Sequence, residues 1–174
     1  GQEMPVYFHQ NLATWHKIHF LYDKETLISL RSMLNQMEHK HLLERLLHVI
    51  ENKDGHRIAM HVEAAKIGLS NADVQKLLLD CVEDNLAVDV TKDDFNQAIL
   101  EDVQRVCQSA DHTLGDAGVK HSDITKIFMT GGSTSIPYVR QAIMSMFPQA
   151  DVVDGHTFGS VGTGLSLHAG RVFK

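Results

Sequence analysis

The feature that most constrains this chain is segment 126–139, KIFMTGGSTSIPYV, in which an apolar run ends in two glycines. Small hydroxyl residues follow, and Pro137 then stands where it suits the first turn of a helix. This order predicts a strand, a tight turn and a helix. Glycine lets the backbone approach a ligand closely, and a helix N-terminus favours anionic groups. The alternative is a strand-to-helix turn that binds nothing, and the segment alone leaves it open.

The residues around this turn predict a β-α-β-α unit. Residues 124–130 and 150–153 have the apolar, branched character of buried strands, and residues 137–147 predict a helix between them. Two strands joined by one helix at this length favour parallel pairing. A glycine-rich helix is expected over 157–173.

The earlier part of the chain is predicted to be mainly helical, with the broadest apolar stripe over 40–53. Glu83-Asp84-Asn85 is a turn-forming cluster between two short apolar runs, and it predicts a hairpin. The expected elements are an irregular segment over 1–22 that packs on the helices after it, helices over 24–36, 40–53 and 56–69, strands over 74–82 and 86–90, and one long helix from Thr91 to about residue 114, ended by Gly115 and Gly118.

Composition excludes several classes of protein. Hydrophobic residues make up 43% and charged residues 22%, which is the usual globular mix. The net charge is -6 without a Lys/Arg cluster, which argues against nucleic-acid binding. No apolar run approaches the roughly 18 residues of a membrane span, and no signal peptide is visible. Cys81 and Cys107 have no pairing or metal spacing, so a reduced cytoplasmic compartment is expected.

Other constellations point to ordinary structural roles. The twelve histidines include the close pairs 16/19 and 39/41, but no cysteines or carboxylates stand at zinc-ligand spacing. We expect no metal site. No Gly-x-Ser-x-Gly segment supports a catalytic triad, and no catalytic residue is predicted.

A second candidate feature lies on the predicted helix 56–69. Glu63, Lys66 and Ser70 follow one another at positions i, i+3 and i+7, so they share one helix face. A Glu and a Lys one turn apart are usually a solvated surface pair. They can also hydrogen-bond the hydroxyls of a ribose.

Together these two motifs resemble the nucleotide-binding domain of the Hsp70 chaperones, in the actin-like ATPase superfamily with its ribonuclease H-like fold. The carrying residues are Glu63-Ala64-Ala65-Lys66 and the run 131–137, Gly-Gly-Ser-Thr-Ser-Ile-Pro. The resemblance covers roughly residues 56–174. The predicted helices that begin at residue 24 agree with the family more weakly. Phe158-Gly159-Ser160-Val161 is similar to the short, divergent bacterial Hsp70-like chaperones.

The resemblance implies an α/β, helix-rich fold, lobe II of such an ATPase domain. A helical upper subdomain with a β-hairpin is expected over 1–98, and a partial lower subdomain over 99–174. It also implies that adenine nucleotide is bound, with the ribose on the Glu and Lys, the base near the Ser, and the glycines close to the adenosine and phosphates. The implied binding residues are Glu63, Lys66, Ser70, Gly131, Gly132, Ser133 and Ser135.

Two single residues and one four-residue segment depart from the family pattern. Ile67 and Ser135 stand where the family has the two arginines that sandwich the adenine ring, which puts base recognition in doubt. Residues 156–159, His-Thr-Phe-Gly, replace the family's Asn-Pro-Asp-Glu.

The family's phosphate-gripping hairpins and the catalytic lysine of its first lobe do not occur in this sequence. We therefore expect no ATPase activity from this fragment, no ATP or ADP bound to it, and a weak Mg-dependent ATPase in the full-length parent. The expected partners are lobe I, a co-chaperone or exchange factor on the upper subdomain, and a second copy pairing at the bare edge of strand 124–129, unless segment 4–9 covers that edge. The alternative function is a helical protein-interaction module that has lost nucleotide binding.

Overall fold

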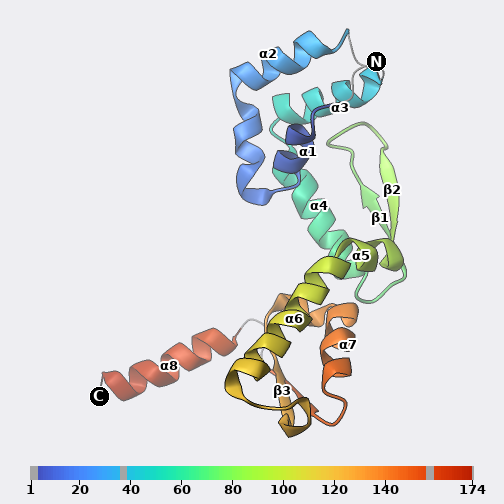
Figure 1. Ribbon diagram of the computed structural model, residues 1–174. Helices are drawn as coiled ribbons and strands as arrows, with labels where there is room; N and C mark the ends of the chain where they lie inside the picture. The colour runs from blue at the N-terminus through green and yellow to red at the C-terminus, as the bar shows by residue number, and fades with distance from the viewer. Residues whose placement is uncertain (1–3, 36–38, 156–158, 174) are drawn as a thin grey trace. The chain divides into compact units, whose positions relative to one another are not determined.

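The computed structural model describes residues 4–35, 39–155 and 159–173, and the chain divides into two compact units, Gly1–Thr91 and Lys92–Lys174. The first unit contains α1 (Val6–Leu12), the 3-10 helix η1 (Trp15–Tyr22), α2 (Lys24–Met33), α3 (Lys40–Glu51), α4 (Gly55–Gly68), β1 (Val74–Leu78) and β2 (Ala87–Thr91) (Figure 1). The second contains α5 (Lys92–Ala98), α6 (Leu100–Ala117), η2 (His121–Asp123), β3 (Lys126–Met129), η3 (Gly132–Ser135), α7 (Pro137–Met146), β4 (Asp151–Asp154) and α8 (Ser160–Val172). This is the predicted helix-rich α/β class. The subdomain boundary expected at 98/99 stays a prediction.

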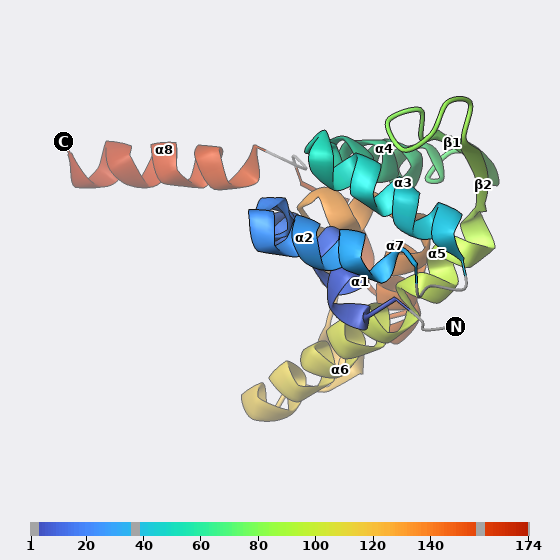
Figure 2. The ribbon, with the colours of Figure 1, turned by 90° about the horizontal axis from the view of Figure 1, so that it is seen from above.

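The core of the first unit is built on the leucine stripe of α3. Leu43 and Ile50 are almost completely buried, and α2 packs beside them with Leu30 (Figure 2). Phe8 of α1 and Leu21 of η1 complete this cluster. The irregular conformation expected for 1–22 is therefore wrong, because most of the described part of the segment is helical, while its predicted packing on the helices is confirmed.

Helix α4 is held close to its neighbours at both ends. Gly55 opens it directly after Asp54, and a Cβ atom there would lie 2.5 Å from Ile18 Cγ2. Near the other end, a Cβ on Gly68 would lie 2.5 Å from the Gln75 side chain of β1. The hairpin is confirmed as an antiparallel pair, with Lys76 opposite Asp89. These close approaches fix the helix that carries Glu63 and Lys66.

The second unit contains the predicted parallel β-α-β arrangement. Strands β3 and β4 pair in parallel, with Lys126 opposite Asp151, and α7 lies between them in sequence. The single helix expected from Thr91 is wrong, because the chain breaks at Ile99 into α5 and α6. Gly118 ends α6 in a left-handed conformation, as predicted, whereas Gly115 lies inside the helix.

Much apolar surface of the second unit is exposed. Met129 is buried, but Phe128 on the other face of β3 is 71% exposed, and the apolar side chains of α8 are exposed as well. Within the described residues β3 pairs with β4 alone. Residues 6–9 of the segment 4–9 belong to helix α1, so the prediction that this segment covers the strand edge as an added strand is wrong.

Candidate functional site

One half of the predicted site lies on α4. The Lys66 ammonium forms an ion pair with the Glu63 carboxylate, one helical turn away. The Glu63 side chain is 56% exposed and that of Lys66 36%, so both charged groups face solvent. Ser70 follows in the turn after the helix, where its backbone N–H donates to the Ile67 carbonyl. Ile67, which replaces an arginine of the family pattern, is exposed on the same helix.

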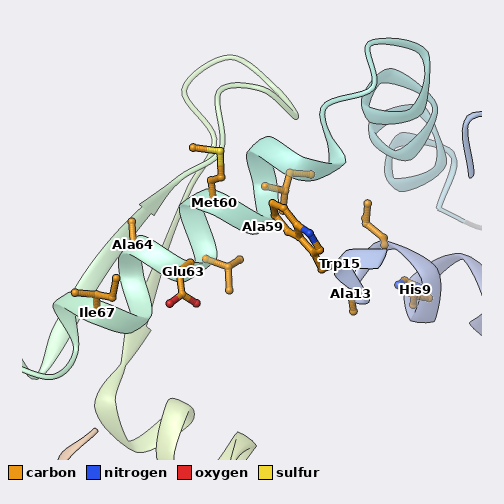
Figure 3. Close-up of a pocket in the computed structure, with 11 residues that line it drawn as sticks. His9, Ala13, Trp15, Ala59, Met60, Glu63, Ala64 and Ile67 are labelled. Carbon is orange, nitrogen blue, oxygen red and sulfur yellow. The ribbon is translucent and has the colours of Figure 1, made fainter. Parts of the chain in front are cut away.

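A surface groove of about 940 Å³ runs beside this face of α4 (Figure 3). Helix residues from Ile58 to Ile67, including Glu63, form one wall, and α1 with the start of η1 forms the other. Trp15 lines the groove and is 58% exposed. Its indole meets the His56 ring edge-on at a centroid distance of 4.6 Å. The groove thus places a wide apolar surface next to the Glu63 carboxylate.

The other half of the predicted site is the glycine turn after β3. Gly131 has φ 89° and ψ 154°, a backbone conformation that other residues rarely adopt. Its carbonyl accepts hydrogen bonds from the Thr134 hydroxyl at 2.7 Å and the Thr134 N–H at 3.2 Å. Apart from its two chain neighbours, no described residue has an atom within 4 Å of the position that a Cβ on Gly131 would take. Glycine is therefore required here by the backbone and not by crowding.

The turn leads into α7 through a single 3-10 turn. Gly132, Ser133 and Ser135 belong to η3, and the Ser133 carbonyl accepts from the Ile136 N–H at 3.2 Å. Pro137 occupies the start of α7, as its fixed φ predicts. Ser135 is exposed and offers a hydroxyl where the family pattern has an arginine.

An ion pair that the sequence analysis missed ties α7 to β4. Arg140 donates from two nitrogens to the two Asp154 oxygens, at 2.6 and 3.0 Å. The hydrogen bonds from Arg140 hold the pKa of Asp154 below its ordinary value, and Asp154 raises the pKa of Arg140. Asp154 pairs in register with Met129, two residues before Gly131, so this clamp lies beside the glycine turn. The carboxyl ends of parallel strands lie at the same edge of a sheet, so the predicted parallel pairing could have indicated that Asp154, at the end of β4, lies near the glycine turn after β3.

The structure brings together most of the predicted residues within each set, but Ser70 lies beyond the end of α4 and therefore does not share the helix face of Glu63 and Lys66. Glu63 and Lys66 are in contact on α4 of the first unit, and residues 131–135 form one turn of the second. Phe158, which carries part of the resemblance, lies outside the described residues. Among the described residues, no group of three or more His, Cys, Asp or Glu side chains is placed to hold a metal ion. None of the helices in that part of the chain is long and apolar enough to cross a membrane.

Sequence comparison assigns the family. The family model described as "Hsp70 protein" matches residues 33–169, which include every predicted site residue. The chaperone protein HscA of Cronobacter sakazakii is 32% identical over 105 residues, covering 60% of this chain and 16% of that protein. The HscA homolog of Histophilus somni is 39% identical over 82 residues, covering 47% of this chain and 13% of that protein.

The similarity extends to a eukaryotic protein. The mitochondrial-type heat shock protein 70 of Encephalitozoon cuniculi is 30% identical over 86 residues, covering 49% of this chain. The chain spans only 13–16% of the length of these three relatives. The chain therefore belongs to the Hsp70 family and corresponds to part of an Hsp70-type nucleotide-binding domain.

Proposed function

We propose that this chain is the adenine-nucleotide-binding lobe, lobe II, of an Hsp70-like ATP-dependent chaperone of the cytoplasm. The helical subdomain over 1–98 supplies Glu63, Lys66 and Ser70, and the partial subdomain over 99–174 supplies the glycine turn with Ser133 and Ser135. Membership of the Hsp70 family supports this proposal.

The observation that carries the proposal is the exposed Glu63–Lys66 pair on α4. A carboxylate accepts hydrogen bonds from two neighbouring hydroxyls, and an ammonium donates to them, which suits the 2′ and 3′ hydroxyls of a ribose. Both groups face solvent and lie one turn apart, so they can bind a sugar without leaving a buried charge. The Gly131 conformation adds a backbone that a nucleotide can approach closely.

We further propose that the isolated chain is not an ATPase. Phosphoryl transfer requires a positioned metal ion, phosphate contacts and an oriented water molecule. In the full-length protein, lobe I would supply the phosphate contacts and would hold Mg²⁺ with the nucleotide. Hydrolysis would then be a property of the assembled domain.

Calorimetric titration of ADP into the full-length protein tests the proposal. Lys66→Ala should weaken binding by about 1–2 kcal/mol, the scale of a charge-assisted hydrogen bond. Lys76→Ala is the matched control, because Lys76 is an exposed lysine on β1 outside the proposed site. Equal affinities for wild type and both variants would refute the assignment of the ribose to α4.

A second candidate function, a protein-interaction module without nucleotide, is favoured by exposed apolar residues on the upper helices. Ile28 of α2 is 67% exposed and Leu42 of α3 is 44% exposed. A co-chaperone or exchange factor could dock there in either case. A full-length protein that binds no ADP, and whose partner binding is lost on Ile28→Glu, would support this second function instead.

A further inference from the structure

Helix α3 presents a polar face to the hairpin loop, residues 79–86, and this face is separate from its leucine stripe. Four side chains at positions i, i+3, i+4 and i+7 share the polar face: His41, Glu44, Arg45 and His48. The loop faces them across a surface pocket of about 310 Å³, which it lines with Asp80, Val82, Glu83 and Asp84 (Figure 1). The pocket therefore lies between two elements of the first unit that are far apart in sequence.

One ion pair joins the loop to the helix across this pocket. Arg45 Nε donates to a carboxylate oxygen of Glu83 at 2.5 Å. The hydrogen bond from Arg45 is the main cause that holds the pKa of Glu83 below its ordinary value, and the charge of His41 acts in the same direction. Both side chains of the pair are partly exposed, so salt and water can compete for them.

Carboxylates outnumber cations in the pocket. Of its lining residues, four carry a carboxylate and Arg45 alone carries a permanent positive charge. Histidine is the side chain that ordinarily changes its charge between about pH 5 and 8. Protonation of His41 and His48 would bring the cations on this face of α3 to three, against the same four carboxylates. The ring of His39 lies 6.1 Å from that of His41 and would oppose a small part of this gain when charged.

The loop carries a residue that reports on its position. Cys81 is a free cysteine and is only 4% exposed, although Asp80 before it is exposed. The loop also has internal bonds of its own, because the Asp80 carboxylate accepts from the Asn85 N–H at 3.1 Å. A movement of the loop away from its closed position would expose the Cys81 thiol.

We propose that the hairpin loop is an ionic latch on α3, closed by the Arg45–Glu83 pair and tightened by protonation of His41 and His48. The latch opens more often at about pH 8 than at about pH 6, because the carboxylates of the pocket then face fewer cations. Opening is a motion within the first unit, so it requires no bound nucleotide. The loop is thereby a pH- and salt-sensitive element of the fold.

Thiol labelling of the folded full-length protein measures how often the latch opens. Alkylation of Cys81 is quantified by mass spectrometry, and the rate in the urea-unfolded protein is divided by the rate in the folded protein at the same pH. This ratio, the protection of Cys81, cancels the pH dependence of thiol reactivity itself. We expect protection to rise about two- to fivefold from about pH 8 to about pH 6, and to fall in about 1 M NaCl.

Charge reversal tests the ion pair. Arg45→Glu should lower the protection of Cys81 by roughly two- to fivefold, and the added change Glu83→Arg should restore it. Arg31→Gln is the matched control, because it removes an ion pair with Glu51 in the same unit outside the pocket and should leave Cys81 protected. Circular dichroism should show all variants folded.

A second pair of variants tests the histidines. The double change His41→Gln and His48→Gln should abolish the rise in protection on acidification while leaving the value at about pH 8 close to that of wild type. The double change His16→Gln and His19→Gln is the control, because these exposed histidines of η1 do not line the pocket, and it should keep the rise.

Three results would overturn the latch. The first is equal protection of wild type at about pH 8 and pH 6, or a rise that survives the loss of His41 and His48. The second is a failure of Glu83→Arg to rescue Arg45→Glu. The third is labelling of Cys81 with the same urea dependence as global unfolding, because the loop would then not open by itself.

Discussion

Replacing Gly55 by alanine is expected to destabilise the first unit, although alanine is usually the better helix former. Gly55 is buried at the start of α4, and its N–H donates to the Tyr22 hydroxyl at 3.1 Å. An added Cβ would lie 2.5 Å from Ile18 Cγ2 and 2.8 Å from the Tyr22 hydroxyl oxygen. Ile18 is completely buried, and protein interiors are close-packed with few voids into which a side chain could move.

The size of the effect follows from these distances. Carbon atoms pack at about 3.5–4.0 Å, so the contact with Ile18 is short by roughly 1 Å. Overpacking of this kind costs about 1–3 kcal/mol, and the helix propensity of alanine offsets up to about 1 kcal/mol. We expect Gly55→Ala to lower the free energy of unfolding by roughly 1–2 kcal/mol.

Urea denaturation followed by tryptophan fluorescence measures this loss. Trp15 contacts His56, the residue after Gly55, and therefore reports on unfolding of the first unit. The matched control is Gly115→Ala in α6, where the added Cβ would meet no atom within 4 Å in the part of the chain that the structure describes, apart from the helix's own backbone and the neighbouring residues. That control should gain about 0.4–1 kcal/mol, measured by far-UV circular dichroism. A Gly55→Ala variant as stable as wild type, or more stable, would refute the packing described around α4.

Three further predictions concern the second unit. Gly131→Ala should lower the free energy of unfolding of the second unit by about 1–3 kcal/mol in urea denaturation, because a φ of 89° strains any residue with a Cβ atom. An unchanged urea midpoint would show that the turn adapts freely to alanine. Asp154→Asn should destabilise the protein at pH 7. Arg140 holds the pKa of Asp154 below its ordinary 3.8, so the ion pair stabilises the folded protein fully above pH 3.8 and loses this effect as the pH falls through the lower folded-state pKa. A stability difference between wild type and Asp154→Asn that persists unchanged in acid would contradict the role of the carboxylate. Light scattering should show that the isolated chain forms concentration-dependent dimers. In the described residues β3 pairs only with β4, and an unpaired strand edge is a template for another strand. A monomer at every concentration would argue against edge pairing.

Elements with a strong local signal could be predicted from the sequence. The leucine spacing of α3 predicts a buried stripe without reference to distant residues. The turn-forming cluster at 83–85 predicts the hairpin. The parallel pairing of β3 and β4 followed from one helix between two strands. Contact between Glu63 and Lys66 likewise follows from their spacing on one helix.

Features that depend on tertiary contacts could not be predicted in the same way. Helix η1 has no clear 3.6-residue apolar period, and its Ile18 and Leu21 are buried where η1 contacts α3 and α4. The break at Ile99 interrupts an otherwise continuous apolar pattern. The groove pairs Trp15 with a helix far along the chain, so only the folded first unit brings its two walls together.

A crystal structure of the full-length protein with ADP would test the central proposal most directly. The account predicts ribose hydroxyls within hydrogen-bonding distance of the Glu63 carboxylate and the Lys66 ammonium, with the Gly131-Gly132 backbone against the nucleotide. Bound ADP whose ribose contacts neither Glu63 nor Lys66 would contradict it.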